Sequence, residues 1–176
     1  MSLTLPGLEK VKERIVEISK KTIKAGVLSG TYEDGTNIAY VAAIQEFGAP
    51  AANIPPRPFM STTVAERQKQ WKSSLARGIA AAAAGTVDAN DVMDQVGGLM
   101  AADIQKKISE INSPALSPIT VMLRGMRGKD ASLVVTGSTV GEAAARVANG
   151  DDNYGASTKP LVDSGLLLKS ISFKVD

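Results

Sequence analysis

Two long runs of apolar residues at helical spacing, in the middle of the chain, restrict its fold more than any other feature. The second run is the clearer one, and it consists of Val92, Val96, Leu99, Met100, Ile104, Ile108 and Ile111. This spacing marks one face of an α-helix, which Asp88 can cap. Gly97 and Gly98 interrupt it and cost about 1 kcal/mol each relative to alanine. We therefore expect either close approach of another backbone at these glycines or a kink.

The first run predicts another long helix directly before this one. Its apolar face comprises Val64, Trp71, Leu75 and Ile79, and a stretch of alanines follows up to Gly85. Thr63 and Glu66 have the spacing of a capping box, which places the expected start of the helix at Thr63. Gly85 can take the left-handed conformation that ends a helix. The centre of the chain is therefore expected to be strongly helical.

The amino-terminal part favours a helix followed by two strands. Apolar residues at helical spacing predict a helix from about Pro6 to Thr22. Ile23–Gly30 has the composition of a strand, and Glu33-Asp34-Gly35 is a turn signal that ends in an Asp-Gly pair. A second strand is expected around 36–38. The ending Ile171–Val175 alternates apolar and polar residues, which predicts a half-buried strand.

A short helix and a proline-rich strap follow the predicted hairpin. The spacing of Tyr40, Ile44 and Phe47 predicts a helix that fills the core and ends at Gly48. Within Ile54–Phe59, three prolines in four residues, Pro55, Pro56 and Pro58, force an extended backbone. We expect this strap to hold Arg57 outward and to place Phe59 in an apolar slot. Arg57 either pairs with a carboxylate such as Glu46 or is solvated.

The segment after the long helices has a weaker pattern. Leu133–Thr136 resembles a strand, and Thr139–Asn149 suits either a short helix or a mobile loop. Between these helices and the final strand, the sequence predicts a flexible insertion at about 124–157. Its basic residues Arg124, Arg127 and Lys129 lie among glycines, so we expect a basic loop. This loop either contacts DNA phosphates or a partner subunit, or is solvated.

Composition excludes several kinds of chemistry. The 176 residues include no cysteine and no histidine, which excludes disulfides, thiolate zinc sites and histidine-based triads. A Ser157–Lys159 dyad and a cation site at Asp151, Asp152 and Asp163 are formally open, but neither has the spacing of a known motif. The net charge is only +2, and 44% of the residues are hydrophobic, enough for one domain spanning 1–176. We expect a protein without catalytic activity, metal or cofactor.

No segment of the sequence indicates a membrane or an export signal. The first ten residues lack an apolar core behind a basic start, so we expect no signal peptide. The most apolar run, Ile79–Gly85, is too short to span a bilayer. The expected location is therefore a cytoplasm.

Three sequence blocks together resemble one family. They are Tyr40–Gly48, which ends in Glu46-Phe47-Gly48; Ile54–Phe59, which contains Pro56-Arg57-Pro58-Phe59; and Lys159–Ile171, which contains Pro160-Leu161-Val162-Asp163-Ser164-Gly165. Their order is similar to that in the tail-completion and minor tail proteins of long-tailed bacteriophages, also called phage virion morphogenesis proteins. The sequence departs from the common pattern at Gln45, Ala49 and Ser164.

The resemblance implies a small α+β fold, in which two or three helices pack on a small antiparallel sheet within a single domain with long loops. It also implies a ring of identical subunits, expected to be sixfold, at the junction of head and tail, with other tail or neck proteins as partners. The location would be the virion, after assembly in the host cytoplasm or from a prophage. Asp163 would cap a turn or helix near Gly165, and Leu167 or Leu168 would pack inward. The alternative is a small DNA-binding protein that uses residues 124–129.

Overall fold

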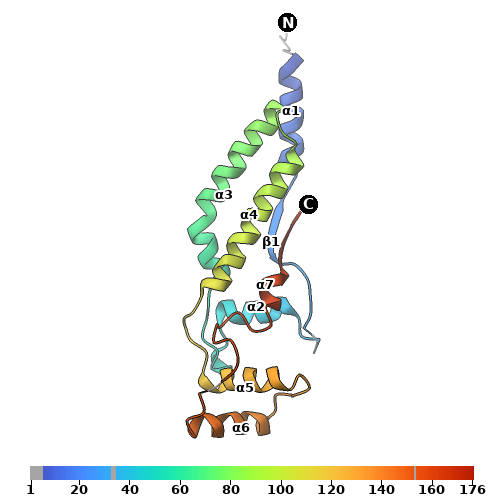
Figure 1. Ribbon diagram of the computed structural model, residues 1–176. Coiled ribbons are helices and arrows are strands. Elements are labelled where there is room, and N and C mark those ends of the chain that lie inside the picture. The colour runs from blue at the N-terminus through green and yellow to red at the C-terminus, as the bar shows by residue number, and fades with distance from the viewer. Residues whose placement is uncertain (1–5, 33–34, 153) are drawn as a thin grey trace.

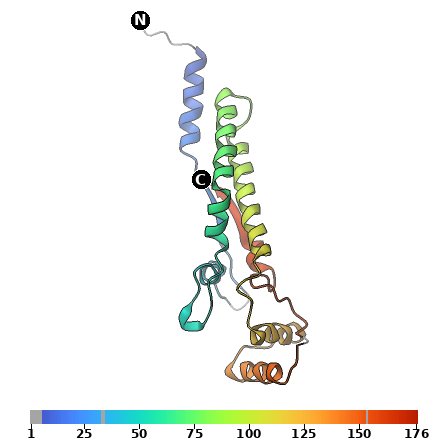
Figure 2. The same cartoon turned by 90° about the vertical axis from the view of Figure 1, so that its left-hand side faces the viewer.

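The molecule is long and is built around a helical hairpin. The computed structural model describes residues 6–32, 35–152 and 154–176. Helices α3 (Phe59–Ala84) and α4 (Ala89–Glu110) lie side by side along the length of the molecule (Figures 1 and 2). Helix α1 (Pro6–Ser19) packs near their connection, at the end of the molecule opposite to α5 and α6. The two long helices predicted from the sequence are confirmed.

The ends of the two long helices follow local rules, with one exception. Gly85 takes a left-handed backbone with φ of 81° and ends α3, and the Asp88 side chain accepts a hydrogen bond from the Asn90 N–H. However, α3 begins at Phe59, so the predicted capping box at Thr63 is wrong. The buried Thr63 hydroxyl instead donates to the Phe59 carbonyl at 2.6 Å, as a residue inside the helix does.

A two-stranded antiparallel sheet packs on α4. Strand β1 (Ile23–Val27) pairs with β2 (Ile171–Val175), with Ala25 opposite Phe173. At Gly97 an added Cβ would lie 2.3 Å from the Phe173 ring, whereas at Gly98 the nearest approach is 3.8 Å. The predicted close packing at the glycines is thus confirmed for Gly97, but the neighbour is a side chain and not a backbone. The final strand is confirmed.

The connection from β1 to α3 contains helix α2 (Ile38–Phe47) and a short 3-10 turn, η1 (Pro50–Ala52). The expected strand at 36–38 is wrong: Asn37 makes one isolated bridge with Thr31, and its side chain caps α2 by accepting from Ala39 and Tyr40. The predicted turn lies partly outside the described residues, since Glu33 and Asp34 are not described. The helix ending at Gly48 is confirmed.

Helices α5 (Pro118–Lys129) and α6 (Gly137–Ala148) form a separate pair at one end of the molecule (Figure 2). They pack on each other through Met122, Met126 and Ala143. The stretch that contains Arg124, Arg127 and Lys129 is therefore helical, and the prediction of a basic loop is wrong. The helical alternative for the second segment is confirmed, and the flexibility of 124–157 stays a prediction.

The main core joins the hairpin, the sheet and α2. It contains Ile38, Ala42, Phe59, Ala101, Ile104, Ile108, Leu161, Leu167 and Ile171. Leu167 belongs to the short helix α7 (Leu166–Ser170), which leads directly into β2. The predicted inward packing at this position is confirmed, and so is the α+β class with a small antiparallel sheet.

Candidate assembly site

The three sequence blocks meet at one place in the fold. Ala42 from α2, Phe59 from the start of α3 and Leu161 from the segment before α7 belong to the same buried cluster. Within the strap, Pro56 and Pro58 are exposed while Arg57 and Phe59 are buried, the alternation of an extended chain. The predicted apolar slot for Phe59, which is 1% exposed, is confirmed.

Gly48 fixes the path from α2 into the strap. Its φ is 77°, a value that glycine adopts without strain. An added Cβ would lie 2.9 Å from the Ile54 carbonyl oxygen and 2.9 Å from the Pro56 nitrogen. A side chain at this position would therefore push the strap away from α2.

Glu46 of α2 caps the amino-terminal end of α3, where the preceding residue, Pro58, makes no capping hydrogen bond. Its side chain is buried, and its two carboxylate oxygens accept hydrogen bonds from the Met60 N–H at 2.8 Å and the Ser61 N–H at 2.9 Å. A negative charge at this position complements the free N–H groups and the positive end of the helix dipole. The carboxylate of α2 therefore fixes α2 against α3.

Arg57 is also buried, at 3% exposure. Its guanidinium donates to the carbonyls of Pro114 at 2.9 Å and Ala115 at 3.2 Å, and to the Gln45 side-chain oxygen at 3.2 Å. Burial lowers the pKa of Arg57, and the nearby charge of Arg124 lowers it further. Both the outward orientation and the pairing with Glu46 are therefore wrong: Arg57 ties the strap to the segment before α5.

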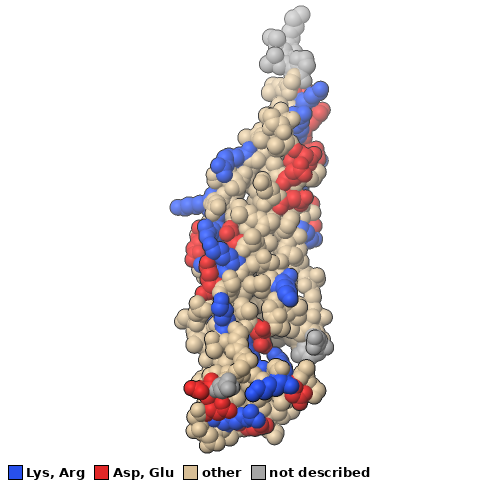
Figure 3. All heavy atoms as spheres, in the orientation of Figure 1, with Lys and Arg blue, Asp and Glu red and all other residues tan. Residues whose placement is uncertain are grey.

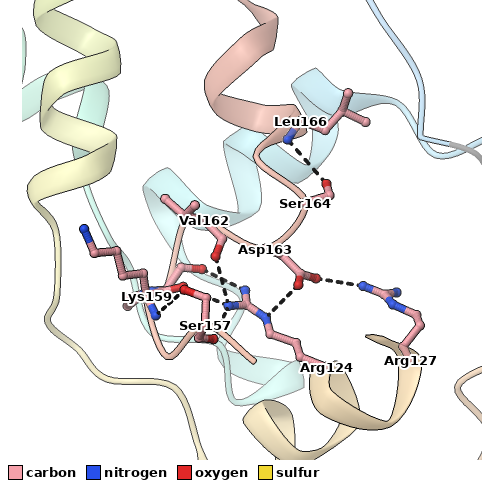
Figure 4. A network of polar contacts seen from close by, with 9 residues as sticks. Arg124, Arg127, Ser157, Lys159, Val162, Asp163, Ser164 and Leu166 are labelled. Carbon is pink, nitrogen blue, oxygen red and sulfur yellow. Dashed lines mark hydrogen bonds and ion pairs between the residues drawn. The ribbon is translucent and has the colours of Figure 1, made fainter. Parts of the chain in front are cut away.

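Arg124 holds the segment before α7 in the same way (Figure 4). It donates to the carbonyls of Ser157 (3.2 Å), Lys159 (2.8 Å), Val162 (3.4 Å) and Pro160 (3.2 Å). Its side chain is only 11% exposed, and its Nε lies 3.5 Å from an Asp163 oxygen. Burial lowers the pKa of the Arg124 guanidinium, whereas Asp163 raises it. This arginine therefore acts as a clamp on residues 157–163.

Asp163 has a different role from the predicted one. Its other carboxylate oxygen accepts from Arg127 at 2.7 Å, while Ser164 accepts from the Leu166 N–H at 3.3 Å. Gly165 has φ of 74° and directly precedes α7. The prediction that Asp163 caps this helix is therefore wrong, because its charge is used by two arginines of α5.

Most of the three basic side chains predicted to contact DNA are already engaged within the protein. Arg124 is committed to protein carbonyls, and Arg127, although half exposed, is paired with Asp163. Lys129 is exposed and makes no ion pair with any residue that the structure describes. On the face shown in Figure 3, basic side chains are interspersed with acidic ones, and no broad basic field is present. The geometry thus gives the DNA-binding alternative no additional support.

The exposed face of α2 carries two aromatic side chains. Tyr40 is 63% exposed and Phe47 78%, so the prediction that they fill the core is wrong. The buried face of α2 instead carries Ile38, Ala42 and Glu46. Beside the helix lies a groove of about 340 Å³, lined mostly by apolar residues that include Val27, Phe59 and Met60. Two aromatic side chains and an apolar groove are therefore open to a partner.

Neither chemical site considered from the sequence forms. The Lys159 ammonium donates to the Ser109 carbonyl at 3.2 Å and not to the Ser157 hydroxyl. Across the described residues, no three acidic side chains are grouped so that they could bind a metal ion.

None of the described helices is both long and apolar enough to cross a membrane. No family model, curated protein or solved structure matches the chain.

Proposed function

We propose that this chain is a structural assembly protein of a long-tailed bacteriophage, which forms a ring that completes the tail and joins it to the head. The observation that carries this proposal is the face of α2 on which Tyr40 and Phe47 are exposed. The order of the three sequence blocks supports the phage assignment. The exposed face supports a role in association between proteins.

The composition of α2 explains why this face favours association. Glu46 is the only charged residue of α2, and it is buried. A helix that is apolar all round is normally buried on all sides. Large exposed apolar patches mark interaction sites, and aromatic side chains are frequent anchors of protein interfaces. The exposed side of α2 therefore fits a surface that another protein covers.

The buried polar contacts of α2 hold its exposed face in a fixed position, which favours association. Glu46 fixes α2 to α3, and Arg57 bonds to Gln45 of α2. A preformed surface loses less conformational entropy on association than a mobile one. A ring also requires two different mating patches on each subunit, and the α2 face supplies one candidate.

Particles made without this protein test the proposal. We expect electron microscopy to show separate heads and tails, and complementation with the wild-type gene to restore joined particles. Phe47→Ser should fail to complement, whereas Val87→Ser should succeed, since Val87 is also exposed but lies between α3 and α4. Joined, infectious particles in the absence of the protein would refute the proposed function.

A further inference from the structure

The sheet has an open edge along β1. Thr22 and Asp176 exchange both of their backbone hydrogen bonds at 3.0 Å. Bonded and non-bonded pairs alternate in an antiparallel ladder, so the N–H and C=O groups of Ile23, Ala25 and Val27 point away from β2. None of these groups bonds to any residue that the structure describes. β1 can therefore accept a further strand.

Two separate apolar hollows lie at the two ends of β1. One hollow of about 480 Å³ is lined by Ile23 of β1, by Trp71 and Leu75 of α3 and by Val96 of α4. The groove beside α2 begins at Val27, the other end of β1. A strand added to β1 would lie roughly 4.8 Å from it, with one of these hollows at each end. The edge of β1 thus offers backbone partners for a third strand, and the two hollows offer apolar cover at its ends.

The chain also contains a strand-like segment without a sheet. Leu133–Thr136 has the composition of a strand and links α5 to α6, but it pairs with no described strand. Val134 is 71% exposed and Val135 52%. Thr139 donates to the Val134 carbonyl, whereas the N–H and C=O of Val135 bond to no described residue. This segment can therefore donate a short strand.

The open edge and the unpaired segment lie far apart within one molecule. Both views place the α5–α6 pair at one end, whereas β1 lies near the middle (Figures 1 and 2). We propose that Val134 and Val135 of one copy pair with the open edge of β1 in the next copy. Backbone bonds would give the affinity, and a valine side chain would enter one of the two hollows. The donor and acceptor surfaces differ, so the contact is heterologous and can close a ring. The link between this strand pairing and a ring rests on the proposed function.

Cysteine cross-linking tests this pairing in the full chain, which has no native cysteine. Lys24→Cys places a thiol on β1, and it is combined with either Val134→Cys or Val135→Cys to cover both strand faces. We expect oxidation to give a ladder of covalent multimers from at least one pair. The matched control pairs Lys24→Cys with Val87→Cys, which is also an exposed valine, and should give no ladder beyond dimers.

A second variant shows whether the ladder needs strand pairing. In whichever pair gives the ladder, glutamate at the other donor valine (Val135→Glu with Val134→Cys, or Val134→Glu with Val135→Cys) should abolish it, whereas Val87→Glu in the same pair should leave it unchanged. Absence of a ladder from both donor pairs, or a ladder that survives the glutamate substitution, overturns the inference. If the ladder is absent but Phe47→Ser still changes the oligomeric state of the chain, only the strand donation is wrong and the proposed ring is retained.

Discussion

Gly97 and Gly98 allow a sharp test of how the sheet packs on α4. Replacing either glycine by alanine should gain about 1 kcal/mol from helix propensity. At Gly98 the new Cβ would lie 3.8 Å from the Phe173 ring, an ordinary contact. We therefore expect Gly98→Ala to stabilise the fold by about 0.5–1 kcal/mol.

Gly97→Ala should have the opposite effect. Its Cβ would lie 2.3 Å from Cδ2 and 2.9 Å from Cγ of Phe173, so the ring must move. Overpacking of this kind typically costs about 1–3 kcal/mol, which exceeds the gain in propensity. The expected net loss in the free energy of unfolding is about 1–2 kcal/mol, measured by urea denaturation followed by circular dichroism.

The double variant isolates the cause. Phe173→Ala removes the ring, so Gly97→Ala in that background should become stabilising, and the two substitutions should be strongly non-additive. If Gly97→Ala is as stable as Gly98→Ala, or if its cost persists without Phe173, the packing of β2 against α4 described above is wrong.

Four further outcomes follow. Phe59→Ala should cost about 3–5 kcal/mol of stability in urea denaturation, because the ring is fully buried; a cost below 1 kcal/mol would contradict its place in the core. Arg124→Met should raise amide hydrogen exchange in residues 157–163 and leave exchange in α4 unchanged. Hydrogen bonds from Lys174 and Lys24 hold the pKa of Asp176 at about 2, so the stability that these bonds contribute should be lost as the pH falls from about 4 to about 2. Asp176→Asn should therefore reduce the fall of the urea midpoint of unfolding over this pH range. Phe47→Ser should change monomer stability by less than about 0.5 kcal/mol, because the side chain is exposed.

The sequence predicts those parts of the fold that depend on neighbours along the chain. The periodic apolar residues of α4, its cap at Asp88 and the end of α3 at Gly85 all follow local rules, and the structure confirms them. The apolar slot predicted for Phe59 at the end of the strap is also confirmed. These features were accessible because each depends on residues only a few positions away.

The long-range hydrogen bonds of Arg57 and Arg124 could not be predicted from the sequence, for a physical reason. Arg57 and Arg124 bond mainly to backbone carbonyls from distant segments, and every residue carries the same carbonyl group. A sequence pattern therefore gives no sign of these partners. The error at Tyr40 and Phe47 has another origin: both faces of α2 are apolar, so the spacing alone does not decide which face is buried.

Native mass spectrometry of the purified chain, with and without Phe47→Ser, tests most directly whether this protein acts by assembling through its α2 face. The wild-type chain should give one closed oligomer, expected to be a hexamer, and the variant should give monomer with an unchanged fold by circular dichroism. A wild-type chain that stays monomeric at high concentration, or a variant that assembles as the wild type does, would contradict the proposed role of this face.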